Sequence, residues 1–196
     1  GNVGGNSTNS PGGAAHDSRT WPVHPGSGAG NIDMTSEGGG GGGAIWIDVD
    51  GELQLDGELR ANGGDGLIGY ASLERLGGGG AGGSVLLVCQ QLTGSGLIRA
   101  KGGNGAQGTT LRAGGGAGGR VAIWYGMNRP ARQPLLDNLD NPAVWNKIEE
   151  TGAPSGFIGA TPTVAGGDGY QTGGGEGTMV FFRLIAPPSG TLLIVR

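Results

Sequence analysis

Three acidic residues, Asp48, Asp50 and Glu52, recur at every second position of one segment. Because side chains alternate across a β-strand, these carboxylates would share one face, and paired carboxylates are the groups that sugar-cleaving enzymes use. The same alternation places polar residues on the wet face of any half-buried strand, so solvation accounts for the three acids without catalysis. We therefore expect no catalytic residues and no enzyme activity.

Two histidines, His16 and His24, lie in a segment rich in glycine and proline, with Asp17 and Asp33 as companions. Imidazole and carboxylate groups are common metal ligands. Two Gly-Gly-Asp-Gly segments, 63–66 and 166–169, resemble the calcium-binding nonapeptide of repeat-in-toxin proteins, but the Asp comes two places early and the tandem repetition is missing. A turn in which Asp adopts left-handed geometry explains both segments without an ion. We expect no metal and no cofactor.

Aromatic residues are the remaining candidates for a binding surface. Trp46 and Trp124, followed by Tyr125, occupy nearly equivalent places after two glycine blocks. On neighbouring strands, equivalent positions would align the two indoles into a ladder. Three roles stay open for this ladder: interior packing, contact with a neighbouring subunit, and stacking against a glycan.

An internal repeat of roughly 36 to 40 residues organises the chain, and such periods are typical of repetitive architectures. Each copy consists of a glycine block, a strand, a second strand and a Gly-Gly-polar-Gly turn. The copies are residues 38–66, 77–105, a third that opens at 114–125, and a degenerate fourth within 156–180. Residues 127–155, with four prolines, interrupt the pattern as an insertion or loop. We therefore divide one structural domain into 1–126, 127–155 and a final repeat at 156–196.

Apolar residues alternate with polar ones within the copies, as at Ile45, Ile47 and Val49. This period of two predicts strands with one dry and one wet face. Short strands at a fixed period, separated by glycines, predict an all-β fold: a glycine-rich parallel β-helix or β-roll-like stack of short strands. The glycine blocks have two interpretations, polyproline II-type helices packed through bare backbone, or tight corners with positive φ.

The composition and charge of the chain limit the classes of partner that we expect for it. Glycine supplies 49 of 196 residues without the every-third spacing of collagen. The net charge of −4, with Lys and Arg scattered singly, predicts no nucleic-acid partner. The longest apolar runs fall far short of the roughly 20 residues that cross a bilayer. The single Cys89 forms no internal disulfide, and Asn6-Ser7-Thr8 makes Asn6 a candidate N-glycosylation site. Because the chain starts at Gly1 without an initiator Met or signal peptide, it reads as a fragment or mature segment.

The order of these motifs resembles the glycine-rich repeat regions of very large surface proteins of protists and bacteria. The matching residues are 25–30, 40–47, 59–64, 97–103, 114–125, 177–180 and 190–194. This resemblance implies an extracellular structural or adhesive role, such as the body of flagellar hairs or other surface filaments. It carries over no catalytic residues.

We expect this chain to be a structural subunit or segment of an extracellular filament, appendage or surface coat. Its partners would be other copies of itself, joined through strand edges and glycine-rich surfaces. The alternative is a rigid adhesin or carbohydrate-binding module of a cell-surface glycoprotein, displaying residues 1–37 and 127–155 to glycans. An enzyme acting on polysaccharides ranks below both.

Overall fold

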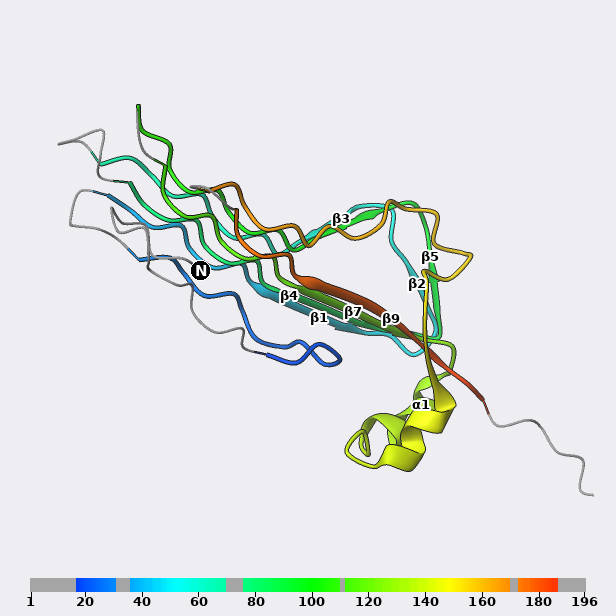
Figure 1. The fold of residues 1–196 in the computed structure, drawn as a ribbon. Helices are drawn as coiled ribbons and strands as arrows, with labels where there is room; N and C mark the ends of the chain where they lie inside the picture. Colours follow the sequence, from blue (N-terminus) through cyan, green and yellow to red (C-terminus); the bar gives the residue numbers. More distant parts are fainter. Residues whose placement is uncertain (1–16, 31–35, 70–75, 110–111, 170–172, 187–196) are drawn as a thin grey trace, which may run out of the picture.

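The computed structural model describes residues 17–30, 36–69, 76–109, 112–169 and 173–186. Its elements, in chain order, are β1 (Ala44–Asp48), β2 (Glu52–Gln54), β3 (Glu58–Arg60), β4 (Ser84–Val88), β5 (Gln91–Thr93), β6 (Leu97–Arg99), β7 (Arg120–Tyr125), α1 (Arg129–Leu136), the 3-10 helix η1 (Pro142–Lys147), β8 (Ile148–Thr151) and β9 (Thr178–Leu184). Figure 1 shows β1, β4, β7 and β9 side by side, with glycine-rich segments continuing from one end of these strands and α1 near the other.

The largest sheet has five strands in the order β1-β4-β7-β9-β8. The pairings from β1 to β9 are parallel, whereas β8 pairs antiparallel with β9. Ala44 pairs with Ser84, and Ser84 with Arg120, so equivalent residues are 40 and 36 positions apart. The repeat inferred from the sequence is therefore confirmed as the unit of strand pairing.

Two small parallel sheets complete each repeat. β2 pairs with β5 and β3 pairs with β6, each at an offset of 39 residues, as in Glu58 with Leu97. Isolated bridges from Gly94 to Phe157 and from Arg99 to Thr163 continue these two pairings into the third repeat. Residues 156–164, beyond the insertion, therefore occupy the places that β5 and β6 occupy one repeat earlier, and they complete the third repeat, although the sequence pattern indicated that they begin a fourth copy.

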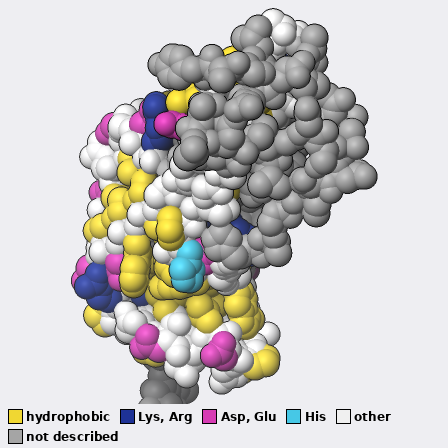
Figure 2. Space-filling model, turned by 90° about the vertical axis from the view of Figure 1, so that its left-hand side faces the viewer, with side chains coloured by type: hydrophobic (Ala, Val, Ile, Leu, Met, Phe, Trp, Pro, Cys, Tyr) yellow, Lys and Arg dark blue, Asp and Glu magenta, His cyan; other side chains and the backbone are white. Residues whose placement is uncertain are grey.

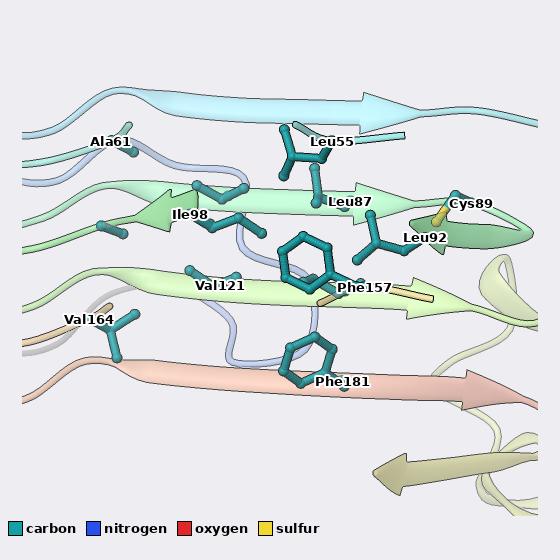
Figure 3. Packing of buried hydrophobic residues seen from close by; sticks show 13 residues of the cluster. Leu55, Ala61, Leu87, Cys89, Leu92, Ile98, Val121, Phe157, Val164 and Phe181 are labelled. Carbon is teal, nitrogen blue, oxygen red and sulfur yellow. The ribbon is translucent and has the colours of Figure 1, made fainter. Parts of the chain in front are cut away.

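The main core lies between the large sheet and the two small ones (Figure 3). Leu87, Val121 and Phe181 project from the large sheet, and Leu92 and Ile98 meet them from the small sheets. The opposite face of the large sheet is buried too, because residues 21–23, α1 and η1 pack over it. Burial on both faces explains why β4 reads as a continuous apolar run rather than an alternating one.

The glycine-rich segments form a bundle of extended chains held by backbone hydrogen bonds. Within 77–83, the N–H groups of Gly79 and Gly82 donate to residues 114 and 117, those of Gly80 and Gly83 donate to residues 64 and 61, and that of Ala81 donates to Ser27. The donor direction thus repeats every third residue, which is the periodicity of a polyproline II helix. Among the described glycines only Gly94 and Gly126 have positive φ, so the glycine blocks are not tight corners.

Close approach of the backbones is the reason for glycine in these blocks. A Cβ on Gly39 would overlap the carbonyl oxygen of Gly64, and one on Gly42 would overlap that of Ala61. Gly40 and Gly43, in contrast, have no atom within 4 Å of the position of a Cβ. Residues 38–43 therefore pack on two sides and are open on a third.

The prediction of an all-β parallel β-helix or β-roll is wrong. The fold is mixed: a five-stranded sheet with one antiparallel strand, two small parallel sheets, and helices in the segment 127–155. No closed barrel or solenoid is formed within the described ranges. Pro130 and Pro134 indicated a loop, but Pro130 occupies the first turn of α1, where no N–H is needed, and Asn128 caps that helix by accepting from Ala131. No helix in the described part is long and apolar enough to cross a membrane.

Candidate functional site

Along one side of the first repeat, residues 38–66, the structure describes no pairing strand. β1 is the edge strand of the large sheet, and β2 and β3 have neighbours only in β5 and β6 among the described strands. At the far side of the large sheet, β8 covers β9. We call the uncovered side of residues 38–66 the open edge.

The backbone of the open edge offers unpaired hydrogen-bonding groups. Ser84 N donates to Gly43 O and Val49 N donates to Val88 O, so odd-numbered residues of β1 face β4. The backbone groups of Ala44 and Trp46 face the other way and have no backbone partner within the described ranges. Gln54 in β2 and Arg60 in β3 face the same side, because Leu55 N and Ala61 N donate to the neighbouring repeat.

The apolar residues of the first repeat are less covered than their equivalents. Ile45, Ile47, Leu53 and Leu59 are only partly buried. Their partners one repeat later, namely Val85, Leu87, Leu92 and Ile98, are at most 1% exposed. At the open edge, therefore, no described strand covers the end of the hydrophobic core.

Acidic side chains of the first repeat bind groups of the second repeat. Glu52 accepts from the Thr93 hydroxyl at 2.5 Å, and Asp56 accepts from Ser95 N at 3.0 Å. The hydrogen bond from Ser95 N is the main reason that the pKa of Asp56 is lowered. Glu58 accepts from Arg60 and lies 3.1 Å from Arg99, and its pKa is lowered chiefly by the Arg60 hydrogen bond.

Of the aromatic candidates, Trp46 is exposed and Trp124 is buried. The side chain of Trp46 is 61% exposed, whereas Trp124 is completely buried and donates from Nε1 to Thr20 O at 2.8 Å. The expected ladder does not form, because Trp46 pairs in register with Leu86 and Trp124 with Val88, two places further on. Trp21 instead bridges the two indoles, with ring centroids 6.2 Å from Trp46 and 6.0 Å from Trp124.

Tyr125, the third candidate, lies at the end of β7 beside the insertion. Its hydroxyl is 2.8 Å from the Thr151 hydroxyl, and its ring is partly buried against the main core. Tyr125 therefore links β7 to β8. Asn6, the candidate glycosylation site, lies outside the described residues.

The carboxylates of Asp48 and Asp50 do not simply face solvent, which corrects the interpretation from alternation. Asp48 pairs with the guanidinium of Arg132 and lies 3.1 Å from Arg129, and Asp50 accepts from Arg129 N at 2.6 Å. Arg132 is completely buried and also donates to Met127 O and Val49 O. These contacts fasten α1 to the end of β1. Sequence reasoning missed Arg132, because a lone arginine in a proline-rich segment gives no signal of burial.

Asp17 and His24 form a hydrogen-bonded clasp. Asp17 accepts from His24 N, lies 3.0 Å from His24 Nδ1, and accepts from the Ser84 hydroxyl at 2.9 Å. Burial alone would raise the pKa of Asp17, but hydrogen bonds from His24, Ser18 and Ser84 lower it to about 2. The clasp holds residues 17–24 over the large sheet. His16 and Asp33 lie outside the described residues, and no cluster of three ligand-type residues occurs in the part described.

The Gly-Gly-Asp-Gly segments are extended rather than turned. Neither Asp65 nor Asp168 has positive φ, so the left-handed turn expected there is wrong. Asp65 Oδ1 accepts from Asn104 N at 2.6 Å, and Asn104 Oδ1 accepts from Asp168 N at 2.8 Å. Residues of this ladder line a groove together with Arg60 and Lys101. Asn104 separates the two carboxylates, and the ladder joins successive repeats.

The face in Figure 2 shows hydrophobic side chains in patches among separate acidic and basic groups. The exposed large apolar residues of the described part include Trp46, Leu67, Ile68 and Ile158. No family model, curated protein or solved structure matches this chain.

Proposed function

We propose that this chain is a non-catalytic structural segment of an extracellular filament, appendage or surface coat. It joins its neighbours, copies of itself or further repeats of the same kind, through the open edge. The observation that carries the proposal is the asymmetry between the two sides: β8 covers β9, while no strand of the described ranges covers the outer side of residues 38–66.

Three properties of the open edge favour an added strand. It offers backbone groups at Ala44 and Trp46 that have no backbone partner among the described residues, partly covered apolar side chains at Ile45 and Ile47, and a glycine segment with free space beside Gly40. Exposed strand edges are templates for pairing with another chain, and added strands bind through backbone hydrogen bonds with side chains giving specificity. The resemblance to glycine-rich surface proteins supports an extracellular location.

Hydrogen exchange tests the structural role. The amides of Trp46, Gln54 and Arg60, which face the open edge, should exchange fast in the isolated chain and at least about ten-fold more slowly in native assembled material. The amides of β4 are the control, because they are bonded in both states. Equal exchange of the three edge amides in both samples would refute assembly through this edge.

A glycan-binding adhesin is the second candidate, and the exposed indole of Trp46 favours it. Aromatic rings with one free face are suited to stacking on sugars. In a glycan-binding assay, Trp46→Ala should abolish binding by an adhesin, while Ile158→Ala, at another exposed apolar residue, should not. Binding that survives Trp46→Ala would remove the observation on which this candidate rests.

A further inference from the structure

The main core ends in a cavity on the side away from the open edge. Met179 and Phe181 of β9 face this core, but no described strand continues the two small sheets beyond the third repeat to cover them. The cavity measures about 250 Å³ and is lined by these two residues, by Phe157 and by residues 150–153. Figure 3 shows the rings of Phe157 and Phe181 close together at this end of the core. Met179 is only partly buried, whereas its partner in β7, Val121, is completely buried.

A column of glycines runs through the repeats and ends at this cavity. Gly57 and Gly96 stand directly before β3 and β6. A Cβ on Gly96 would overlap the carbonyl oxygen of Gly57, and a Cβ on Gly159 would overlap that of Gly96. Each of these repeats therefore stacks a glycine on the glycine of the repeat before it, because no side chain fits between the two backbones. Gly159 lines the cavity, so a fourth repeat would continue the column with a glycine at that place.

The register of the large sheet identifies the next glycine of the column. Ser84 pairs with Arg120 and Arg120 pairs with Thr178, so the second and fourth repeats are 94 positions apart. The residue 94 positions after Gly96 is Gly190. Residues 187–196 lie outside the described part of the chain. The large sheet and the glycine column, two separate features of the fold, thus point to the same residue.

The residues after Gly190 match the two faces of β6. Leu192 stands 94 positions after Ile98, which is 1% exposed and belongs to the main core. Leu193 stands 94 positions after Arg99, whose side chain is 40% exposed. Because side chains alternate along a strand, the same register would direct Leu192 into the core and Leu193 away from it.

We propose that residues 189–194 of this chain add to the third repeat as the next strand after β6, and that Leu192 fills the cavity beside Phe157 and Phe181. Phe181 lies five residues before Ala186, about 17 Å along an extended strand. Leu192 follows Ala186 by six residues, which span about 20 Å when extended, so the chain can return to the cavity. This short connection favours the chain's own segment over that of a second copy, because it raises the effective concentration of the segment at the cavity.

Two adjacent leucines provide a matched pair of variants. Leu192→Ala removes the side chain that fills the cavity and should raise the equilibrium constant of unfolding in urea at least about 30-fold. Leu193→Ala makes the same chemical change on the opposite face and should raise this constant less than about three-fold. Equal effects of the two substitutions would contradict the register that places Leu192 in the core.

Hydrogen exchange detects the added strand without unfolding the protein. Leu97 N donates to Gly57 O at 2.9 Å, so the amide of Thr191, 94 positions after Leu97, should donate to the third repeat. In the unaltered chain and in Leu193→Ala, this amide should exchange at least about ten-fold more slowly than in an end-blocked peptide of residues 187–196. In Leu192→Asp the protection should be lost. Exchange at the rate of the peptide in the unaltered chain would overturn the proposal.

A double-mutant cycle locates the segment at the cavity. Leu192→Ala and Met179→Ala should be coupled, so that their combined effect on the unfolding constant is at least about three-fold smaller than the product of the single effects. Leu135, in the core cluster on the opposite face of the large sheet, is the control, and Leu135→Ala should combine with Leu192→Ala without coupling. If neither pair is coupled, Leu192 docks away from the cavity and the proposal fails.

Dilution separates the chain's own segment from that of a second copy. Protection of the Thr191 amide should be the same over an about 100-fold range of protein concentration and should persist where sedimentation shows monomers. Protection that appears only with dimers would show that copies exchange this segment, which refutes docking within one chain. The cavity and the open edge lie at opposite sides of the large sheet, so these outcomes are distinct from those that test the proposed function.

Discussion

Replacing Gly39 with Ala should destabilise the chain far more than the same change at Gly40. A Cβ at Gly39 would overlap the backbone of Gly64 and Gly80, so the segments would have to separate and strain hydrogen bonds such as Gly39 N to Gly78 O, 2.8 Å long. Overpacking of this kind costs about 1–3 kcal/mol, and here backbone rather than a flexible side chain must shift. Gly40→Ala meets nothing within 4 Å and has no positive φ. This substitution should therefore stabilise the folded state by about 0.4–1 kcal/mol, because alanine lowers the conformational entropy of the unfolded chain.

The expected difference between the two variants is thus about 1.4–4 kcal/mol. Urea unfolding followed by tryptophan fluorescence measures it, provided that both variants show the same dependence on urea. Gly42 and Gly43 form a second matched pair, because a Cβ at Gly42 overlaps Ala61 while Gly43 is free. Equal stabilities within both pairs would show that the glycine segments are not packed backbone to backbone, and would refute the account of the bundle.

The remaining predictions concern buried polar groups. Arg132→Met should lower the free energy of unfolding in urea by about 2–4 kcal/mol, because Asp48 loses its buried partner. Arg129→Met, at a half-exposed ion pair, should lower it by at most about 1 kcal/mol. Similar losses in the two variants would contradict the role of Arg132 in holding α1 against β1. The pKa of Asp17, lowered from 3.8 to about 2, stabilises the fold above pH 4, and this contribution of up to about 2 kcal/mol should vanish as the pH falls from 4 to 2. Asp17→Asn should flatten that part of the pH profile, and an unchanged profile would exclude Asp17 as its source. Burial raises the pKa of the Cys89 thiol to about 12, so alkylation at pH 8 should require unfolding and should slow in stabilised variants; rapid alkylation of the native chain would contradict this burial.

Much of the strand pattern could be predicted from the sequence because it depends on local alternation and on the repeat. Ile45, Ile47 and Val49 indicated the strand that became β1, and the repeat length gave the offset at which β1, β4 and β7 pair. The register of this strand pairing could also have been predicted from the sequence. Trp46 is the third residue after Gly43, the last glycine of its block, and Trp124 is the fifth after Gly119. This difference of two positions matches the observed pairing, in which the two indoles are two places apart.

Less of the candidate site could be predicted from the sequence. The three aromatic candidates were named, but only the fold shows that Trp46 is exposed, that Trp124 is buried and that Trp21 lies between them. Asp48 and Arg132 are 84 positions apart, and nothing local relates them.

The sequence by itself determined where strands form, how long the repeat is and which residues face the core, because these follow from side-chain alternation and spacing. Only the tertiary structure decided the conformation of the glycine blocks, since a residue without a side chain carries no periodic signal and takes its geometry from the backbones that surround it. The tertiary structure also decided the mixed class of the fold. Arg132 is buried against Asp48, 84 positions earlier, and this long-range contact, together with the local cap at Asn128, overrode the loop that the prolines of 127–155 indicated.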